Sequence, residues 1–155
     1  MSEFRRLYHL QVEGKPSFIT FSTIKHLNLD NICKDVILKH VIFENDRRIH
    51  LYVAVMMSDH VHFVFTALND ANGLVYTNGE IIKSIKGISA RGINRILNRS
   101  GNIWQKNYFD HYIRNEEELQ QKVVYVVNNP VESGLVQKPD DYPWLWRRWV
   151  EGEMI

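Results

Sequence analysis

Two histidines in the middle of the chain have a spacing that suits a metal ion. His60 and His62 lie in the run HVHFVFT, which alternates as a β-strand does. Because alternate side chains of a strand leave the same face, both imidazoles point the same way, and two nitrogen ligands can meet one cation. A pair of this kind is also common among packing or surface histidines. A metal site therefore needs a further ligand from elsewhere in the chain.

A helix near the C-terminus offers both a nucleophile and that ligand. The apolar stripe of this helix comprises Leu119, Val123, Val126 and Val127. Tyr125 lies well away from the centre of the stripe, and Asn129 follows one turn later on the same face, with Lys122 on that side as well. A phenol hydroxyl is a weak nucleophile until it is activated, and Lys122 is placed to help by its charge. The alternative is a partly exposed tyrosine whose ring rests on a neighbouring loop.

The elements that position these residues follow from hydrophobic periodicity. The pattern predicts strands at residues 17–23, 49–57, 60–66 and 107–113, and helices at residues 29–44, 80–97 and from Asn115 onward. A tight Ser58-Asp59 turn joins the second and third strands, and Pro130 is expected to close the last helix. The order is that of an α+β, ferredoxin-like βαββαβ antiparallel sheet with an added C-terminal helix carrying the tyrosine. We expect residues 1–155 to form a single domain.

Bulk composition excludes several classes of protein. No stretch approaches the ~20 apolar residues of a membrane span, and the N-terminus lacks the apolar core of a secretory signal. The single cysteine, Cys33, cannot form an internal disulfide. We therefore expect a cytoplasmic protein with no membrane partner.

Charge is concentrated in the centre of the chain. The net charge is only +1, but residues 81–114 carry seven basic residues and one acidic residue. Such a block is typical of binding to a phosphate backbone, and a solvated helix face is the alternative. The candidate DNA-binding residues are Lys83, Lys86, Arg91, Arg95 and Arg99, with Trp104 as a platform on which unpaired bases stack. Trp104 can equally be a core aromatic, and the tail YPWLWRRWV at residues 142–150 is expected to pack over the domain before it touches DNA.

Four segments together resemble a known family. They are MSDHVHFVF at residues 57–65, IIKSIKGISARGINRIL at 81–97, GNIWQKNYFDHYIRN at 101–115 and VVYVVNNPVESGLVQKPDDYPW at 123–144. The chain resembles the HUH single-tyrosine transposases of insertion sequences. Asn129 four residues after Tyr125, followed by Pro130, looks more like the branch of REP-associated tyrosine transposases, where REP denotes repetitive extragenic palindromes. The N-terminus departs from that branch, because LQVEGKPSFITFST follows Tyr8-His9 where an arginine is usual.

The resemblance implies a mechanism and a partner. It implies that His60, His62 and Asn129 bind Mg²⁺ or Mn²⁺, and that Tyr125 cuts and rejoins single-stranded DNA with hairpins through a 5′-phosphotyrosine. The protein would then associate with the nucleoid when it is bound to DNA. The alternatives are a non-catalytic, domesticated DNA-hairpin-binding protein and, less suited to a short chain, a replication initiator or relaxase. Monomer and homodimer both stay open, as does a tyrosine acting in cis or in trans.

Overall fold

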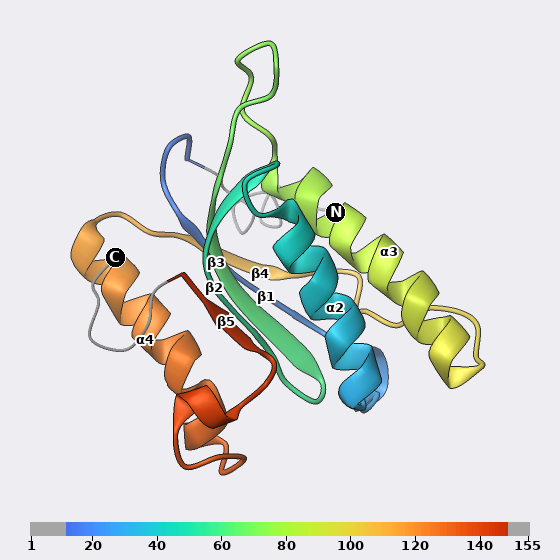
Figure 1. The fold of residues 1–155 in the computed structure, drawn as a ribbon. Helices are drawn as coiled ribbons and strands as arrows, with labels where there is room; N and C mark the ends of the chain where they lie inside the picture. Colours follow the sequence, from blue (N-terminus) through green and yellow to red (C-terminus); the bar gives the residue numbers. More distant parts are fainter. Residues whose placement is uncertain (1–11, 149–155) are drawn as a thin grey trace.

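The computed structural model describes residues 12–148, so the Tyr8-His9 pair and the end of the tail lie outside the described residues. The elements in chain order are β1 (Ser17–Ser22), η1 (Ile24–His26), α2 (Asn31–Glu44), β2 (Ile49–Met56), β3 (His60–Ala67), α3 (Asn78–Leu97), β4 (Phe109–Tyr112), α4 (Glu116–Glu132), η2 (Pro139–Asp141) and β5 (Leu145–Arg147). Figure 1 shows one sheet with helices on both sides.

The sheet has the strand order β4-β1-β3-β2-β5, and every neighbouring pair is antiparallel. The first four strands, with α2 and α3 as their connections, form the ferredoxin-like βαββαβ unit, and α4 follows it. The fold class predicted from the sequence is therefore confirmed. The edge strand β5 is an addition that hydrophobic periodicity did not reveal.

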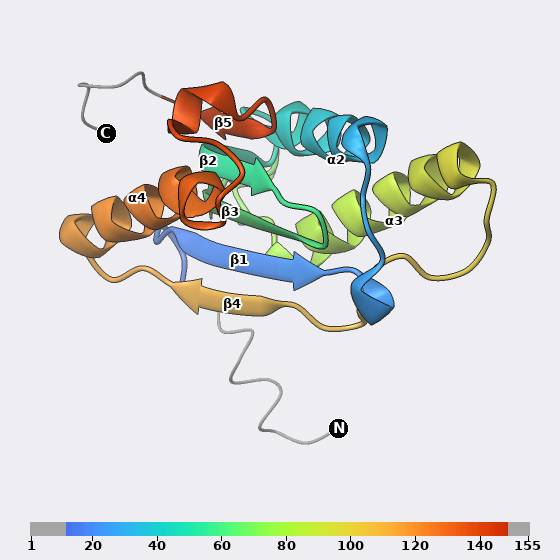
Figure 2. The ribbon, with the colours of Figure 1, turned by 90° about the horizontal axis from the view of Figure 1, so that it is seen from below.

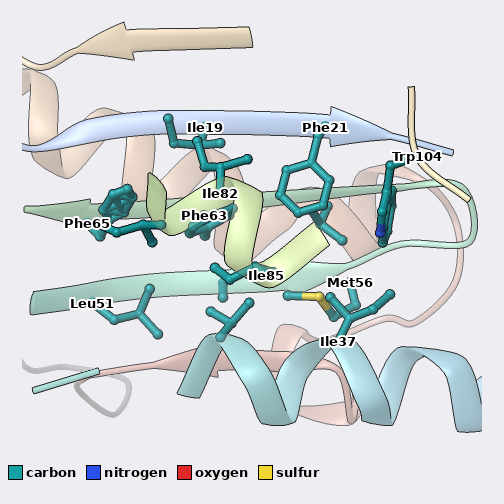
Figure 3. Packing of buried hydrophobic residues seen from close by; sticks show 14 of the residues in the cluster. Ile19, Phe21, Ile37, Leu51, Met56, Phe63, Phe65, Ile82, Ile85 and Trp104 are labelled. Atoms are coloured by element: carbon teal, nitrogen blue, oxygen red, sulfur yellow. The ribbon is translucent and has the colours of Figure 1, made fainter. Parts of the chain in front are cut away.

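The two faces of the sheet carry two separate cores. Helices α2 and α3 cover one face, where the core includes Ile19, Phe21, Phe63, Ile37 and Ile85 (Figures 2 and 3). Helix α4 covers the other face with its predicted apolar stripe, and all four residues of that stripe are buried. Since side chains alternate along β1 and β3, residues such as His62 lie on the α4 face while their neighbours fill the first core.

The end of α4 differs from the expectation. Pro130 was predicted to close this helix, but α4 runs through Pro130 to Glu132. The proline lies in the last turn and is buried, so its missing N–H costs one hydrogen bond near the end rather than in the middle. The chain leaves the helix at Gly134, which has a left-handed φ of 77°. Asn129 therefore belongs to regular helix, one turn after Tyr125.

Helix α3 begins slightly earlier than predicted, at Asn78. Thr77 caps its N-terminus by accepting a hydrogen bond from the backbone N–H of Glu80. Its buried face comprises Asn78, Ile81, Ile82, Ile85, Ser89 and Ile93. Ile88 is only half-buried, and Ile96, in the last turn of α3, is exposed.

The tail packs on the domain, as expected. Strand β5 pairs with β2, and the buried Tyr142 hydroxyl donates a hydrogen bond to the Met56 carbonyl at 2.6 Å. The Trp144 indole donates to Asp35 at 2.7 Å. Within residues 12–148, no helix is long and apolar enough to cross a membrane.

Candidate functional site

The histidine pair lies at the start of β3, and the Nδ1 atom of each ring forms a hydrogen bond. The Nδ1 of His60 donates to the Asp59 carboxylate at 2.8 Å, and the Nδ1 of His62 is hydrogen-bonded to the Thr20 hydroxyl at 2.7 Å. The two ring centroids are 4.8 Å apart. With each Nδ1 engaged, Nε2 is the nitrogen left on each ring for another ligand.

Burial keeps His62 in the form that binds metals. Only 6% of this residue is exposed, and its ring stacks on Phe18 with centroids 5.6 Å apart. Burial, with a smaller contribution from His60, lowers the pKa of His62 to about 3. The imidazole is therefore neutral at neutral pH, and a neutral nitrogen is what a cation requires.

Tyr125 comes to the same place from α4. Its ring centroid lies 5.7 Å from that of His62 and 5.9 Å from that of Phe18, and the residue is 51% exposed. The Lys122 ammonium lies 5.1 Å from the centre of the Phe18 ring. An accessible phenol and a cationic side chain thus border the histidine pair within one chain.

Asn129 supplies the feature that suits a hard cation. Its Oδ1 atom is buried and has no hydrogen-bond partner among the described residues. A buried amide oxygen of this kind costs free energy unless something binds it. Within residues 12–148, no three histidine, cysteine or acidic side chains gather into a potential metal cluster. Two imidazoles and an amide oxygen fit a divalent ion that keeps open coordination positions.

The hydrogen-bond partners that orient the histidine rings were not predicted from the sequence. Asp59 accepts hydrogen bonds from His60 and, at 3.1 Å, from the Nδ1 of His26, and these bonds lower the pKa of its carboxyl group. Lys25 and His26 both have left-handed backbone, with φ of 48° and 53°. Such a conformation is uncommon for residues other than glycine, and it places His26 against Asp59. The only signal in the sequence was an acidic residue directly before the first histidine.

Four of the five basic candidates lie on α3, on the sheet face opposite Tyr125, and Arg99 follows the end of that helix. Lys83, Arg91 and Arg95 are exposed. The Lys86 ammonium instead donates to the carbonyl of Gln105 at 2.9 Å and to those of the next two residues, and burial lowers its pKa to about 8. Arg99 donates to Asn94 and to the Asn102 carbonyl. Lys86 and Arg99 thus stabilise loops beside α3.

Trp104 belongs to the core. Only 6% of it is exposed, its indole N–H donates to Ser89 at 3.0 Å, and its ring contacts Phe21 (Figure 3). The expectation of a platform for stacked bases fails here, because the ring is covered by its own domain. The sequence left two interpretations of Trp104 open, and the structure shows that it is a core aromatic.

Comparison with known proteins agrees with the resemblance seen in the sequence. The family model "Transposase IS200 like" matches residues 20–129. The chain is 27% identical over 146 residues to the REP-associated tyrosine transposase of Escherichia coli (strain K12), covering 93% of this chain and 81% of that protein. It is 28% identical over 94 residues to a putative REP-associated tyrosine transposase of Haemophilus influenzae, covering 57% of this chain and 53% of that one.

A solved structure resembles the whole arrangement. The structure of a REP-associated tyrosine transposase bound to a REP hairpin superposes with a TM-score of 0.71 at 25% identity, covering 94% of this chain and 82% of that one. The matched residues 20–129 run from β1 to Asn129 and so include both histidines and Tyr125. The chain therefore belongs to the IS200-like transposase family of DNA transposases.

Proposed function

We propose that this transposase is a metal-dependent single-stranded DNA endonuclease and strand transferase that acts on hairpin-bearing, palindromic DNA through Tyr125. The observation that carries the proposal is the contact of the Tyr125 ring with the ring of His62, whose centroids are 5.7 Å apart, beside the His60–His62 pair. It is supported by the buried Oδ1 of Asn129, one helical turn after Tyr125, which has no hydrogen-bond partner among the described residues.

His60, His62 and Asn129 would hold the cation, Mg²⁺ or Mn²⁺, through two Nε2 atoms and one amide oxygen. When bound there, a divalent ion supplies Lewis-acid stabilisation of the charge that develops on the phosphate and on the leaving oxygen. The Asp59 and Thr20 hydrogen bonds would hold the two rings in the required tautomer and orientation.

Tyr125 would be the nucleophile. Its hydroxyl oxygen attacks a phosphorus of single-stranded DNA, a new O–P bond to tyrosine forms, and the bond from phosphorus to the 3′ oxygen breaks. The phenol gives up its proton, and the 3′ oxygen takes one up and leaves as a hydroxyl. Attack of a 3′ hydroxyl on the 5′-phosphotyrosine reverses these bond changes and rejoins DNA, so no ATP is needed. The Lys122 ammonium lies over the Phe18 ring that Tyr125 also contacts, so a positive charge borders the nucleophile's side of the helix.

The substrate class is proposed from the relatives. The similar solved structure is of a transposase bound to a REP hairpin, and the fold matches over most of both chains. A non-catalytic hairpin-binding protein is the second candidate. It is disfavoured because binding alone requires neither the histidine pair nor an accessible Tyr125 beside it.

The test is formation of a covalent protein–DNA adduct. Purified protein, Mn²⁺ and a labelled hairpin oligonucleotide with unpaired flanks should give an adduct that is stable in denaturing gels. Tyr125→Phe should give none, whereas Tyr112→Phe should react as the parent does. An equal yield from Tyr125→Phe would show that the nucleophile is another residue.

A further inference from the structure

One aromatic ring near the candidate site is exposed at the edge of the sheet. Phe109 lies in the edge strand β4 and is 51% exposed. In the register of the sheet it lies opposite Thr20 of β1, and Thr20 in turn lies opposite His62 of β3. Residues that lie opposite each other share a face, so Phe109 points to the same side of the sheet as His62. Two strand spacings, about 10 Å, separate them along this row.

A buried ring connects Phe109 to Tyr125 and to the histidines. The Phe18 ring stacks on His62, and its centroid lies 5.9 Å from that of Tyr125 and 6.1 Å from that of Phe109. The planes of Phe18 and Phe109 make an angle of 70°, so this contact is edge to face. Phe109 therefore belongs to the same aromatic surface as the candidate nucleophile.

Phe43, the other exposed phenylalanine of residues 12–148, differs from Phe109 in what covers its ring. Phe43 is 55% exposed on α2, and the guanidinium of Arg47 lies 4.3 Å from the centre of its ring. That contact occupies one face of the Phe43 ring. Among the described residues, neither a cation nor a face-to-face stacked ring covers Phe109. Phe109 thus offers an aromatic face that the described part of the chain does not use.

A positive charge borders this surface. The Lys122 ammonium lies 5.1 Å from the centre of the Phe18 ring, and within residues 12–148 it forms no ion pair with a carboxylate. A nucleotide combines a flat base, which stacks on aromatic rings, with a charged phosphate. An exposed ring and a cation that both contact Phe18 match these two parts.

We propose that Phe109 is a stacking residue for an unpaired base of the strand that Tyr125 attacks, next to the scissile phosphate. The inference rests on the proposed function for the identity of the ligand. Stacking would hold the nucleotide on the α4 face and so position its phosphate at Tyr125 and the histidines. It selects unpaired DNA, because the bases of a duplex already stack on one another. Trp104, the platform expected from the sequence, is buried and cannot take this role.

The experiment compares a hairpin that has unpaired flanks with the same hairpin cut blunt. Fluorescence anisotropy in the Tyr125→Phe background, without metal, measures the affinity of each variant for both. We expect Phe109→Ala to lower the affinity for the flanked hairpin at least about fivefold and to leave the blunt hairpin unaffected. Phe109→Leu keeps an apolar contact with Phe18 but has no ring, so it should lose as much as Phe109→Ala. Phe109→Tyr keeps the ring and should bind as the parent does.

Abasic nucleotides locate the stacked base. Removing single bases of the flank in turn should weaken binding by the parent at one position, and there Phe109→Ala should lose nothing further. Such coupling between one side chain and one base is what direct contact produces. Phe43→Ala is the matched control, because it removes an equally exposed ring from the opposite side of the sheet.

The proposal is overturned if Phe109→Leu binds the flanked hairpin as tightly as Phe109→Tyr or Phe43→Ala does. It is also overturned if Phe109→Leu loses the same factor for the blunt hairpin, or if the parent and Phe109→Ala respond alike to every abasic position. None of these measurements needs catalysis. A parent protein that formed no covalent adduct would refute the proposed function and leave this test intact.

Discussion

At the scale of single residues, the histidine pair depends on partners that come from other segments. Asp59 fixes His60 through Nδ1, and Thr20 fixes His62 in the same way. The Asp59 carboxylate must accept from His60, so it leaves Nε2 of that ring as the lone-pair nitrogen, and the Thr20 hydroxyl leaves Nε2 of His62 in the same way when it accepts from Nδ1. The left-handed turn at Lys25 and His26 brings a third imidazole onto the other oxygen of Asp59. The carboxylate therefore links the β3 turn to the segment after β1.

Removing the Asp59 carboxylate should weaken metal binding more than it weakens the fold. We expect Asp59→Ala to lower the affinity for Mn²⁺ by about 10- to 100-fold, because His60 loses the acceptor that orients it. Asp59→Asn keeps an acceptor oxygen and should lose less. Isothermal titration with Mn²⁺ measures both. Asp46→Ala, which removes an exposed carboxylate near Arg148, is the control, and an Asp59→Ala affinity equal to that of the control would refute the role.

Some residues of the candidate site could be predicted from periodicity within one strand or helix, whereas others are positioned only by contacts between distant segments. His60, His62, Tyr125 and Asn129 share faces within one strand or one helix, so local periodicity was sufficient. Thr20 reaches His62 through the register of β1 on β3, in which these two residues are direct partners. Register between segments 42 residues apart follows from long-range packing, which periodicity does not encode.

At the scale of elements, the contact of α2 with α3 depends on the absence of a side chain at Gly92. A Cβ there would lie 3.0 Å from Val36, a β-branched residue with little freedom to move. Glycine lowers the stability of α3 by about 1 kcal/mol relative to alanine. The close approach of α2 and α3 that glycine allows offsets this cost. Gly92 lies inside the predicted helix at residues 80–97, and the periodicity of one helix carries no information about the helix that packs against it.

A double-mutant cycle separates these two effects. Gly92→Ala in the parent should lower the free energy of unfolding by about 1 kcal/mol, because overpacking exceeds the gain in helix propensity. In the Val36→Ala background the same change should be neutral or stabilising. Urea unfolding of the four proteins measures the coupling. Additive effects of the two substitutions would show that the helices do not clash at this point.

The tail is stabilised by a hydrogen bond that alkaline pH should remove. Burial raises the pKa of Tyr142 to about 12, against about 10 for an unfolded chain. Because the folded-state pKa is the higher one, the folded protein keeps the Tyr142 proton up to a higher pH than the unfolded chain does. The contribution of Tyr142 to the free energy of unfolding is therefore complete below pH 10 and is lost between pH 10 and 12. From pH 9 to pH 11 the free energy of unfolding should fall by about 1 kcal/mol more in the parent than in Tyr142→Phe. Equal falls in both proteins, in urea titrations at the two pH values, would exclude Tyr142 as the group responsible.

The elements at the C-terminal end were the ones that sequence patterns described least well. Pro130 predicted a helix end, yet the proline is buried and α4 continues through it into its last turn. Strand β5 has only three residues, too short for alternation to be visible, and it forms because β2 offers a free edge. In both cases tertiary contact outweighs the local signal.

At the scale of the whole molecule, the sheet separates two surfaces with different chemistry. Helix α4 covers one face of the sheet, and α2 and α3 cover the other (Figure 2). His62 and Tyr125 lie together on the α4 side, whereas the exposed Arg91 and Arg95 belong to α3. Tyr125 lies beside the histidines of its own chain, so the geometry favours a tyrosine that acts in cis and a monomer that is sufficient for cleavage.

Mixing two inactive variants tests the cis arrangement. Tyr125→Phe keeps the histidines, and His60→Ala/His62→Ala keeps the tyrosine. If Tyr125 acts within its own chain, an equimolar mixture should form no more covalent adduct than the separate variants do. Recovery of a substantial part of the parent's adduct would require a tyrosine that serves the partner's histidines. Analytical ultracentrifugation of the same mixture would report whether dimers are present.

The most direct test of the site is a crystal soaked in Mn²⁺ and measured for anomalous scattering. We expect one strong peak within coordination distance of the Nε2 atoms of His60 and His62 and the Oδ1 of Asn129, with the Tyr125 hydroxyl facing the same space. The peak should vanish in Asn129→Ala/His62→Ala. A saturated crystal with no peak at these three atoms, or with Mn²⁺ bound only elsewhere, would contradict this expectation.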